Sequence, residues 1–140
     1  MDIKILKDIL SGDMQTKGVM FDEPMKRHTT LRIGGPADIF AIPGDIISLK
    51  SLLTRLGDED IPVMPLGGGS NLLVSDSGIE GVVLSLAAFD RIEVLRDKGD
   101  DVRLFVGSGV PLQKLVSFCK EKGFNGIEGL AGIPGTVGGA

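Results

Sequence analysis

The sequence predicts an α+β fold of two lobes that divide near Gly67. Two observations support it. Stretches with helical periodicity alternate along the chain with short apolar or alternating stretches that are typical of strands. Glycine accounts for 21 of the 140 residues, against roughly 7% in average proteins, and it gathers between apolar stretches. The glycines are not periodic and 42% of the residues are hydrophobic, which excludes collagen and a disordered chain.

The N-terminal part divides into an extension and a first lobe. Residues 1–18 form the extension, with a short amphipathic helix predicted over residues 3–10 because apolar side chains recur there at helical spacing. The first lobe, residues 19–66, opens in a polar, glycine-containing loop in which residues 18–21 are the one candidate strand. Residues 37–43 alternate and predict a strand that ends at a proline.

A helix is predicted over residues 46–56, where leucine and isoleucine recur every three or four positions. Asp45 is a suitable N-cap, and we expect Gly57 to end the helix. Residues 61–66 are a short apolar stretch and predict a strand that leads into three consecutive glycines.

The second lobe, residues 67–140, continues the alternation. Residues 81–86 are continuously apolar and predict a central strand. Residues 91–109 predict a hairpin that turns at residues 98–100. Residues 111–122 predict a helix with Pro111 in its first turn.

Composition excludes several classes of partner. A net charge of -4 and a pI near 4.9 argue against a nucleic-acid binder, and so does the absence of Trp and Tyr. One cysteine allows no internal disulfide. Since no apolar run approaches the roughly 18 residues of a membrane span, and no signal peptide opens the chain, we expect a soluble, cytoplasmic protein without a membrane partner.

The first glycine cluster lies in "PLGGGSNLLVSD", residues 65–76. Glycine lets successive backbone N–H groups point into one concavity, and such a nest attracts phosphate. The side chains of Ser70 and Asn71 add donors. A Walker loop would need Gly-Lys-Ser/Thr, and a Rossmann fingerprint would have to open a helix, so neither fits. A tight turn between two strands explains a lone triple glycine equally well.

The second cluster lies in "AGIPGTVGGA", residues 131–140. By itself it is more typical of a buried, close-packed turn. Two glycine-rich loops that each follow an apolar stretch favour a ligand with several phosphates, held from both sides.

Three motifs together resemble a known family. "HTTLRIGGPADIF" (28–40), "IPVMPLGGGSNLLVSDSGIEGVVLSL" (61–86) and "GIEGLAGIPGTVGGA" (126–140) resemble the UDP-N-acetylenolpyruvoylglucosamine reductases of bacterial peptidoglycan synthesis. The resemblance covers about residues 20–140 and its motifs fall in the same order. The combination is specific, whereas "GGGSN" alone is not.

The resemblance implies an FAD-binding domain of the vanillyl-alcohol-oxidase (PCMH) type, with non-covalent FAD between two α+β lobes. It also implies that NADPH reduces the FAD, which passes a hydride to the enolpyruvyl group of a UDP-sugar. The residues implied to wrap the FAD pyrophosphate are Gly67, Gly68, Gly69, Ser70 and Asn71. Those implied to border the flavin are Gly132, Ile133, Pro134, Gly135, Thr136, Gly138 and Gly139.

Members of this family continue beyond the position that corresponds to Ala140, so we expect a chain truncated within its FAD-binding domain. The catalytic residues and the substrate-binding domain are expected beyond that point. The chain alone is therefore expected to bind FAD weakly and to be inactive, and its apolar end favours self-association.

Other residues invite less specific interpretations. His28, the only histidine, is more typical of a structural or solvated side chain than of a general base. Cys119 lies on the apolar face of a predicted helix, which favours packing over reactivity. Arg32 could contact a phosphate or be solvated, with solvation slightly favoured. The acidic residues 58–60 have no histidine nearby, so no metal site is predicted. Two other functions remain open: the cofactor part of another flavin oxidoreductase of this fold, and a non-enzymatic anion-binding module.

Overall fold

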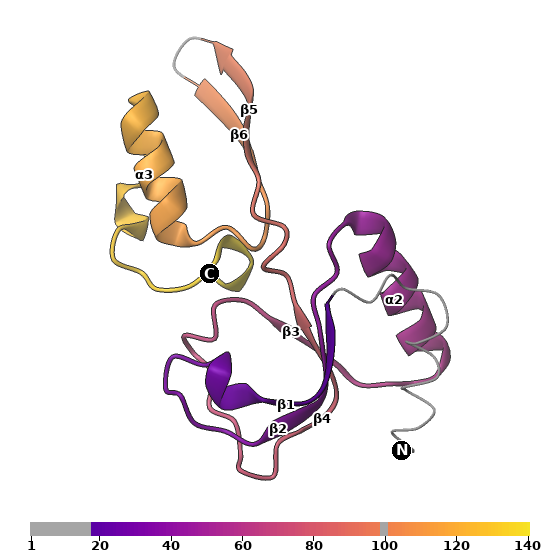
Figure 1. The fold of residues 1–140 in the computed structure, drawn as a ribbon. Coiled ribbons are helices and arrows are strands. Elements are labelled where there is room, and N and C mark those ends of the chain that lie inside the picture. Colours follow the sequence, from indigo (N-terminus) through magenta and orange to yellow (C-terminus); the bar gives the residue numbers. More distant parts are fainter. Residues whose placement is uncertain (1–17, 99–100) are drawn as a thin grey trace.

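A computed structural model describes residues 18–98 and 101–140, and the helix predicted over residues 3–10 lies outside them. Four strands form a mixed sheet in the order β1-β2-β4-β3 (Figure 1). β1 runs antiparallel to β2, while β2 and β3 both run parallel to β4. The strands are β1 (Val19–Pro24), β2 (Pro36–Ala41), β3 (Val63–Leu66) and β4 (Ile79–Ser85).

β4 is an interior strand, as its continuous apolar sequence predicts, because β2 and β3 flank it on both edges. Residues 81–85 are all buried. Val82 and Leu84 face one hydrophobic cluster, which also contains Leu52 and Leu56 of the helix α2 (Ile46–Asp58). Val83 faces the opposite cluster, which includes Met25 of the short 3-10 helix η1 (Met25–Arg27). A strand covered on both faces has no need of polar alternation.

The predicted N-cap of α2 is confirmed. The Asp45 carboxylate accepts a hydrogen bond from the Ser48 backbone N–H at 2.7 Å, and the Asp45 N–H donates to Ser48 Oγ at 3.3 Å, which together form a capping box. The prediction that Gly57 ends the helix is wrong, because α2 continues to Asp58. The chain reverses at Asp60 instead, whose φ of 51° is left-handed, and Ile61 N–H then donates to Leu56 O.

The remainder of the chain forms a hairpin and a helix (Figure 1). β5 (Ile92–Lys98) and β6 (Asp101–Val106) pair antiparallel, as predicted. α3 (Leu112–Lys122) begins after Pro111, which is its N-cap rather than part of its first turn, and ends at Gly123 in the left-handed conformation. A third hydrophobic cluster joins α3 to the hairpin. Two further 3-10 turns follow, η2 (Glu128–Leu130) and η3 (Val137–Gly139).

The four-stranded sheet extends past the division expected near Gly67, because β4 pairs with both β2 and β3. We therefore propose that the two lobes divide after Ser85, where the chain leaves the sheet for the hairpin. Within the described ranges, none of the helices has the length and apolar character that crossing a bilayer requires.

Candidate functional site

The triple-glycine loop follows β3 at the end of the sheet where the parallel strands β3 and β4 finish. Of its three glycines only Gly69 has a positive φ, at 63°. A Cβ on Gly69 would lie 2.0 Å from His28 O, and the Gly69 carbonyl accepts a hydrogen bond from Thr30 N–H at 3.0 Å. Gly69 is therefore required by the backbone itself, since neither the dihedral nor the space admits a side chain.

The backbone N–H groups of residues 67–71 form an unpaired run. Among the described residues, no hydrogen bond uses any of these N–H groups as its donor. Gly69 is buried, and the other four residues of the loop are exposed or half-buried. Successive unpaired backbone N–H groups are the usual components of an anion-binding nest.

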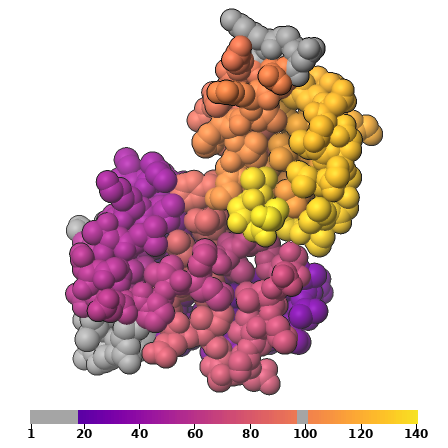
Figure 2. Space-filling view, turned by 180° about the vertical axis from the view of Figure 1, so that it is seen from behind, coloured from indigo at the N-terminus to yellow at the C-terminus, as the bar shows by residue number. Residues whose placement is uncertain are grey.

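The second glycine cluster lies directly against this loop, although about 65 residues of chain separate them. Ser70 Oγ donates to Pro134 O at 3.5 Å. A Cβ on Gly68 would come within 3.5 Å of Gly135 Cα, and one on Gly67 would lie 2.6 Å from Thr136 Oγ1. The space-filling view shows the C-terminal segment resting on the central part of the chain (Figure 2). The structure thus brings together the two loops that the sequence singled out.

Backbone hydrogen bonds hold the second loop in place. Val137 N–H donates to Val110 O and Gly138 N–H donates to Ser108 O, both at 2.9 Å. The Gly135 carbonyl accepts from Leu112 N–H at 3.0 Å. Because these partners belong to the hairpin and α3 region, the site is formed between the two parts of the fold.

A hollow of about 180 Å³ lies where the loops meet. The predicted residues that line it are Gly67, Gly68, Gly69, Ser70, Asn71, Gly135, Thr136 and Gly139. Met64, Pro65, Leu66 and Leu72 complete the lining and were not predicted. Gly132, Ile133, Pro134 and Gly138 are absent from the lining, and Ile133 is 42% exposed.

Thr136 carries an unpaired hydroxyl in this hollow. The residue is 8% exposed, and its Oγ1 is buried without a hydrogen-bond partner among the described residues. Leaving such a group unsatisfied costs roughly 1–3 kcal/mol. Three features of this hollow fit the oxygen atoms of a diphosphate. They are the unpaired Thr136 hydroxyl, the run of unpaired N–H groups over residues 67–71, and the space beside Gly67 that a Cβ would fill.

A second and larger hollow, of about 470 Å³, shares Leu66, Gly67 and Gly68 with the first. Its other lining residues are Arg27, His28, Thr29, Thr30, Arg32, Phe40, Ser85 and Ala87. The loop between β1 and β2 supplies most of them. Gly67 and Gly68 therefore border both hollows.

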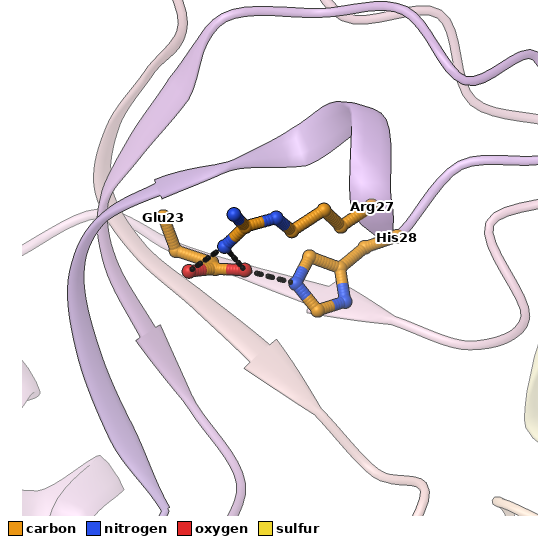
Figure 3. A network of polar contacts seen from close by, with 3 residues as sticks. All are labelled: Glu23, Arg27 and His28. Atoms are coloured by element: carbon orange, nitrogen blue, oxygen red, sulfur yellow. Dashed lines mark hydrogen bonds and ion pairs between the residues drawn. The ribbon is translucent and has the colours of Figure 1, made fainter.

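A network around Glu23 organises this loop (Figure 3). Glu23 is 8% exposed; its carboxylate accepts from His28 Nε2 at 2.9 Å and lies 3.4 Å from an Arg27 guanidinium nitrogen. The hydrogen bond from His28, followed by the contacts with Arg27, lowers the pKa of Glu23 below its ordinary 4.5. His28 also stacks on Phe40, with 3.9 Å between ring centroids. Glu23 was missed by sequence reasoning because it lies in a stretch read as polar loop.

Cys119 lies in the hydrophobic core rather than in the lining of either hollow. Cys119 is 2% exposed within the cluster that joins α3 to the hairpin, and burial raises the pKa of its thiol. This placement agrees with packing rather than reactivity.

The mixed sheet and the two adjoining glycine-rich loops point to a class of domain, which comparison with known families identifies. A family model described as "FAD binding domain" matches residues 37–140, so the chain belongs to the FAD binding domain family. Both glycine-rich loops lie inside the matched range.

Comparison with individual proteins gives a narrower likeness than the family model does. The UDP-N-acetylenolpyruvoylglucosamine reductase of Pelobacter propionicus is 49% identical over 132 residues, which is 94% of this chain and 43% of that protein. The structure of MurB, the reductase of the same name from Thermus caldophilus, matches with a TM-score of 0.64 and 35% identity, over 87% of this chain and 40% of that one. This chain thus spans about two fifths of the length of these relatives. The resemblance drawn from the three motifs is confirmed.

The fold class is confirmed as well. Cholesterol oxidase from Brevibacterium sterolicum has a TM-score of 0.58 at 13% identity, over 79% of this chain and 22% of that one, which shows a shared fold alone. This neighbour is similar only in fold, and the chain itself combines helices with a mixed sheet.

Proposed function

We propose that this chain binds FAD non-covalently, with the diphosphate between residues 67–71 and Thr136. The observation that carries the proposal is the run of unpaired N–H groups over residues 67–71, placed opposite the unpaired Thr136 hydroxyl. None of the described residues that line this hollow is a lysine or an arginine, so backbone dipoles supply the attraction for the anion.

Different residues of the chain would contact the diphosphate and the flavin ring. The N–H groups of residues 67–71 donate to phosphate oxygens, and Thr136 Oγ donates from the opposite loop. The remaining residues of the second loop, Gly132, Ile133, Pro134, Gly135, Gly138 and Gly139, border the flavin ring. When bound, FAD supplies hydride transfer. A covalent link is disfavoured because His28 is engaged by Glu23 and Phe40 and Cys119 is buried.

We further propose that the chain is the FAD-binding region of a reductase that uses NADPH to reduce the enolpyruvyl ether of a UDP-sugar in peptidoglycan synthesis. The names of relatives at 49% and 35% identity support this reading over another flavin oxidoreductase of the same fold. No catalytic residue is assigned within these 140 residues. Since the chain spans 43% of its relative from Pelobacter propionicus, we propose that it does not turn over substrate by itself.

A titration with FAD, and separately with riboflavin, tests the cofactor proposal. Quenching of flavin fluorescence should give a measurable Kd for FAD and a much weaker one for riboflavin, which lacks the diphosphate. Acid precipitation of the complex should then leave the flavin in the supernatant. Equal affinities for the two flavins would contradict the assigned role of the loops, and yellow colour in the pellet would contradict non-covalent binding.

A further inference from the structure

The larger hollow has a positive side chain, Arg32, that does not line the smaller hollow. Arg32 lines this hollow together with Gly67 and Gly68, so it borders the same loop that carries the unpaired N–H groups. Residue 32 precedes the range matched by the family model, which begins at residue 37. A hollow of about 470 Å³ is large enough for a phosphate-bearing part of a ligand.

The other charges at this hollow are already engaged. Arg27 forms an ion pair with Glu23, and His28 bonds to the same carboxylate and stacks on Phe40. In the part of the chain that the structure describes, Arg32 forms neither a salt bridge nor a side-chain hydrogen bond. Arg32 therefore supplies the uncompensated positive charge of this hollow.

The backbone holds Arg32 in an unusual conformation. Its φ is 55°, in the left-handed region that a long side chain rarely adopts. Arg32 N–H donates to Thr29 O at 3.1 Å, and Thr29 Oγ donates to Ile33 O at 3.1 Å. The adjacent hydrogen bond from Thr30 N–H to Gly69 O ties this turn to the triple-glycine loop. Backbone strain that the surroundings maintain is common at ligand sites.

We propose that Arg32 binds a phosphoryl group in the larger hollow, beside Gly67 and Gly68. The guanidinium presents paired N–H donors that match two phosphate oxygens. The inference deepens the proposed function, on which it rests. The phosphoryl group belongs either to the FAD diphosphate or to a second phosphate-bearing ligand that binds next to FAD, and the experiment below separates these sources.

The test uses three variants. Arg32→Asn removes the charge, and asparagine tolerates a positive φ better than most residues, so the turn should survive. Arg32→Lys keeps the charge. Arg103→Asn, on the exposed hairpin strand β6, removes the same charge away from both hollows. Thermal unfolding of each variant confirms that it is folded. Kd is then measured by titration with FAD, and with NADPH and inorganic pyrophosphate on FAD-saturated protein.

If Arg32 contacts the FAD diphosphate, Arg32→Asn should weaken FAD binding roughly tenfold to hundredfold, with a smaller loss for Arg32→Lys and none for Arg103→Asn. The salt dependence of binding should also become shallower in Arg32→Asn. If Arg32 serves a second ligand, FAD affinity should stay unchanged while the affinity for NADPH or pyrophosphate falls by a similar factor. Unchanged affinities in both arms would overturn the inference.

The two proposals fail in different ways. If the unmodified chain does not distinguish FAD from riboflavin, the proposed function fails, whatever the Arg32 variants do. If Gly68→Val loses FAD binding but no affinity depends on Arg32, only the inference about Arg32 fails.

Discussion

Gly68 is the glycine at which the cradle can be filled with the least disturbance of the backbone. Its φ is not left-handed, and a Cβ would meet Gly135 Cα at an ordinary 3.5 Å. We expect Gly68→Val to fold and to abolish FAD binding, because the branches of valine would occupy the space proposed for the diphosphate. Gly44→Val is the matched control, since Gly44 has open space around its Cβ position and no positive φ. Flavin fluorescence titration measures both, and normal FAD binding by folded Gly68→Val would contradict the proposal.

Thr136 allows a prediction in which two measurements move in opposite directions. Replacing it by valine removes a buried hydroxyl that has no partner among the described residues. We expect Thr136→Val to raise the free energy of unfolding of the ligand-free chain slightly, by about 1 kcal/mol or less, while weakening FAD binding roughly tenfold. Thr136→Ser should keep FAD affinity. A Thr136→Val chain that is markedly less stable in urea would show that the hydroxyl already has a partner.

Glu23 makes the stability of the β1–β2 loop depend on pH. Because its pKa is lowered in the folded state, the carboxylate stabilises the fold at pH values above 4.5, and this contribution is lost as pH falls through the lowered pKa. We expect Glu23→Gln to lower the free energy of unfolding at pH 7 by about 1–2 kcal/mol. The difference between the two proteins in urea unfolding should shrink in acid. A difference independent of pH would exclude the charge as its cause.

At the scale of elements, α2 stabilises the sheet through one face. Leu52 is fully buried against Ile39 and Val82, whereas its neighbour Leu53 is 42% exposed. We expect Leu52→Ala to cost roughly 2–5 kcal/mol, since it removes buried methyl groups and leaves a cavity. Leu53→Ala, which has the same effect on helix propensity, should cost much less. Chemical denaturation of both variants measures the difference, and equal losses would contradict the assigned face.

At the scale of the whole molecule, the site lies between two parts of the fold. One loop follows β3 of the sheet and the other is bonded to residues between β6 and α3. A ligand that contacts both loops should stabilise the chain as a unit. We expect FAD at a hundredfold excess over its Kd to add about 2.7 kcal/mol to the free energy of unfolding. Thermal unfolding with FAD and with riboflavin checks this, and Gly68→Val should show no shift.

Much of the fold follows from local patterns. The N-cap Asp45, the apolar strand β4 and the β5–β6 hairpin were all predicted, because each has a signal in residues close in sequence. The end of α2 was predicted wrongly at Gly57. Glycine permits a helix to stop but does not require it, and Leu56 still packs in the core.

The sequence by itself predicted that the two glycine-rich loops bind a phosphate-bearing ligand, which stays a proposal, and its three motifs determined the family to which the chain belongs. Only the tertiary structure decided that β4 pairs between β2 and β3 and that Glu23 contacts both Arg27 and His28. It also decided that the Thr136 hydroxyl has no partner within residues 18–98 and 101–140. The physical reason is the distance along the sequence over which each property is set. Backbone freedom, capping and periodicity depend on neighbouring residues, whereas burial, hydrogen-bond satisfaction and charge pairing depend on atoms that only folding brings together.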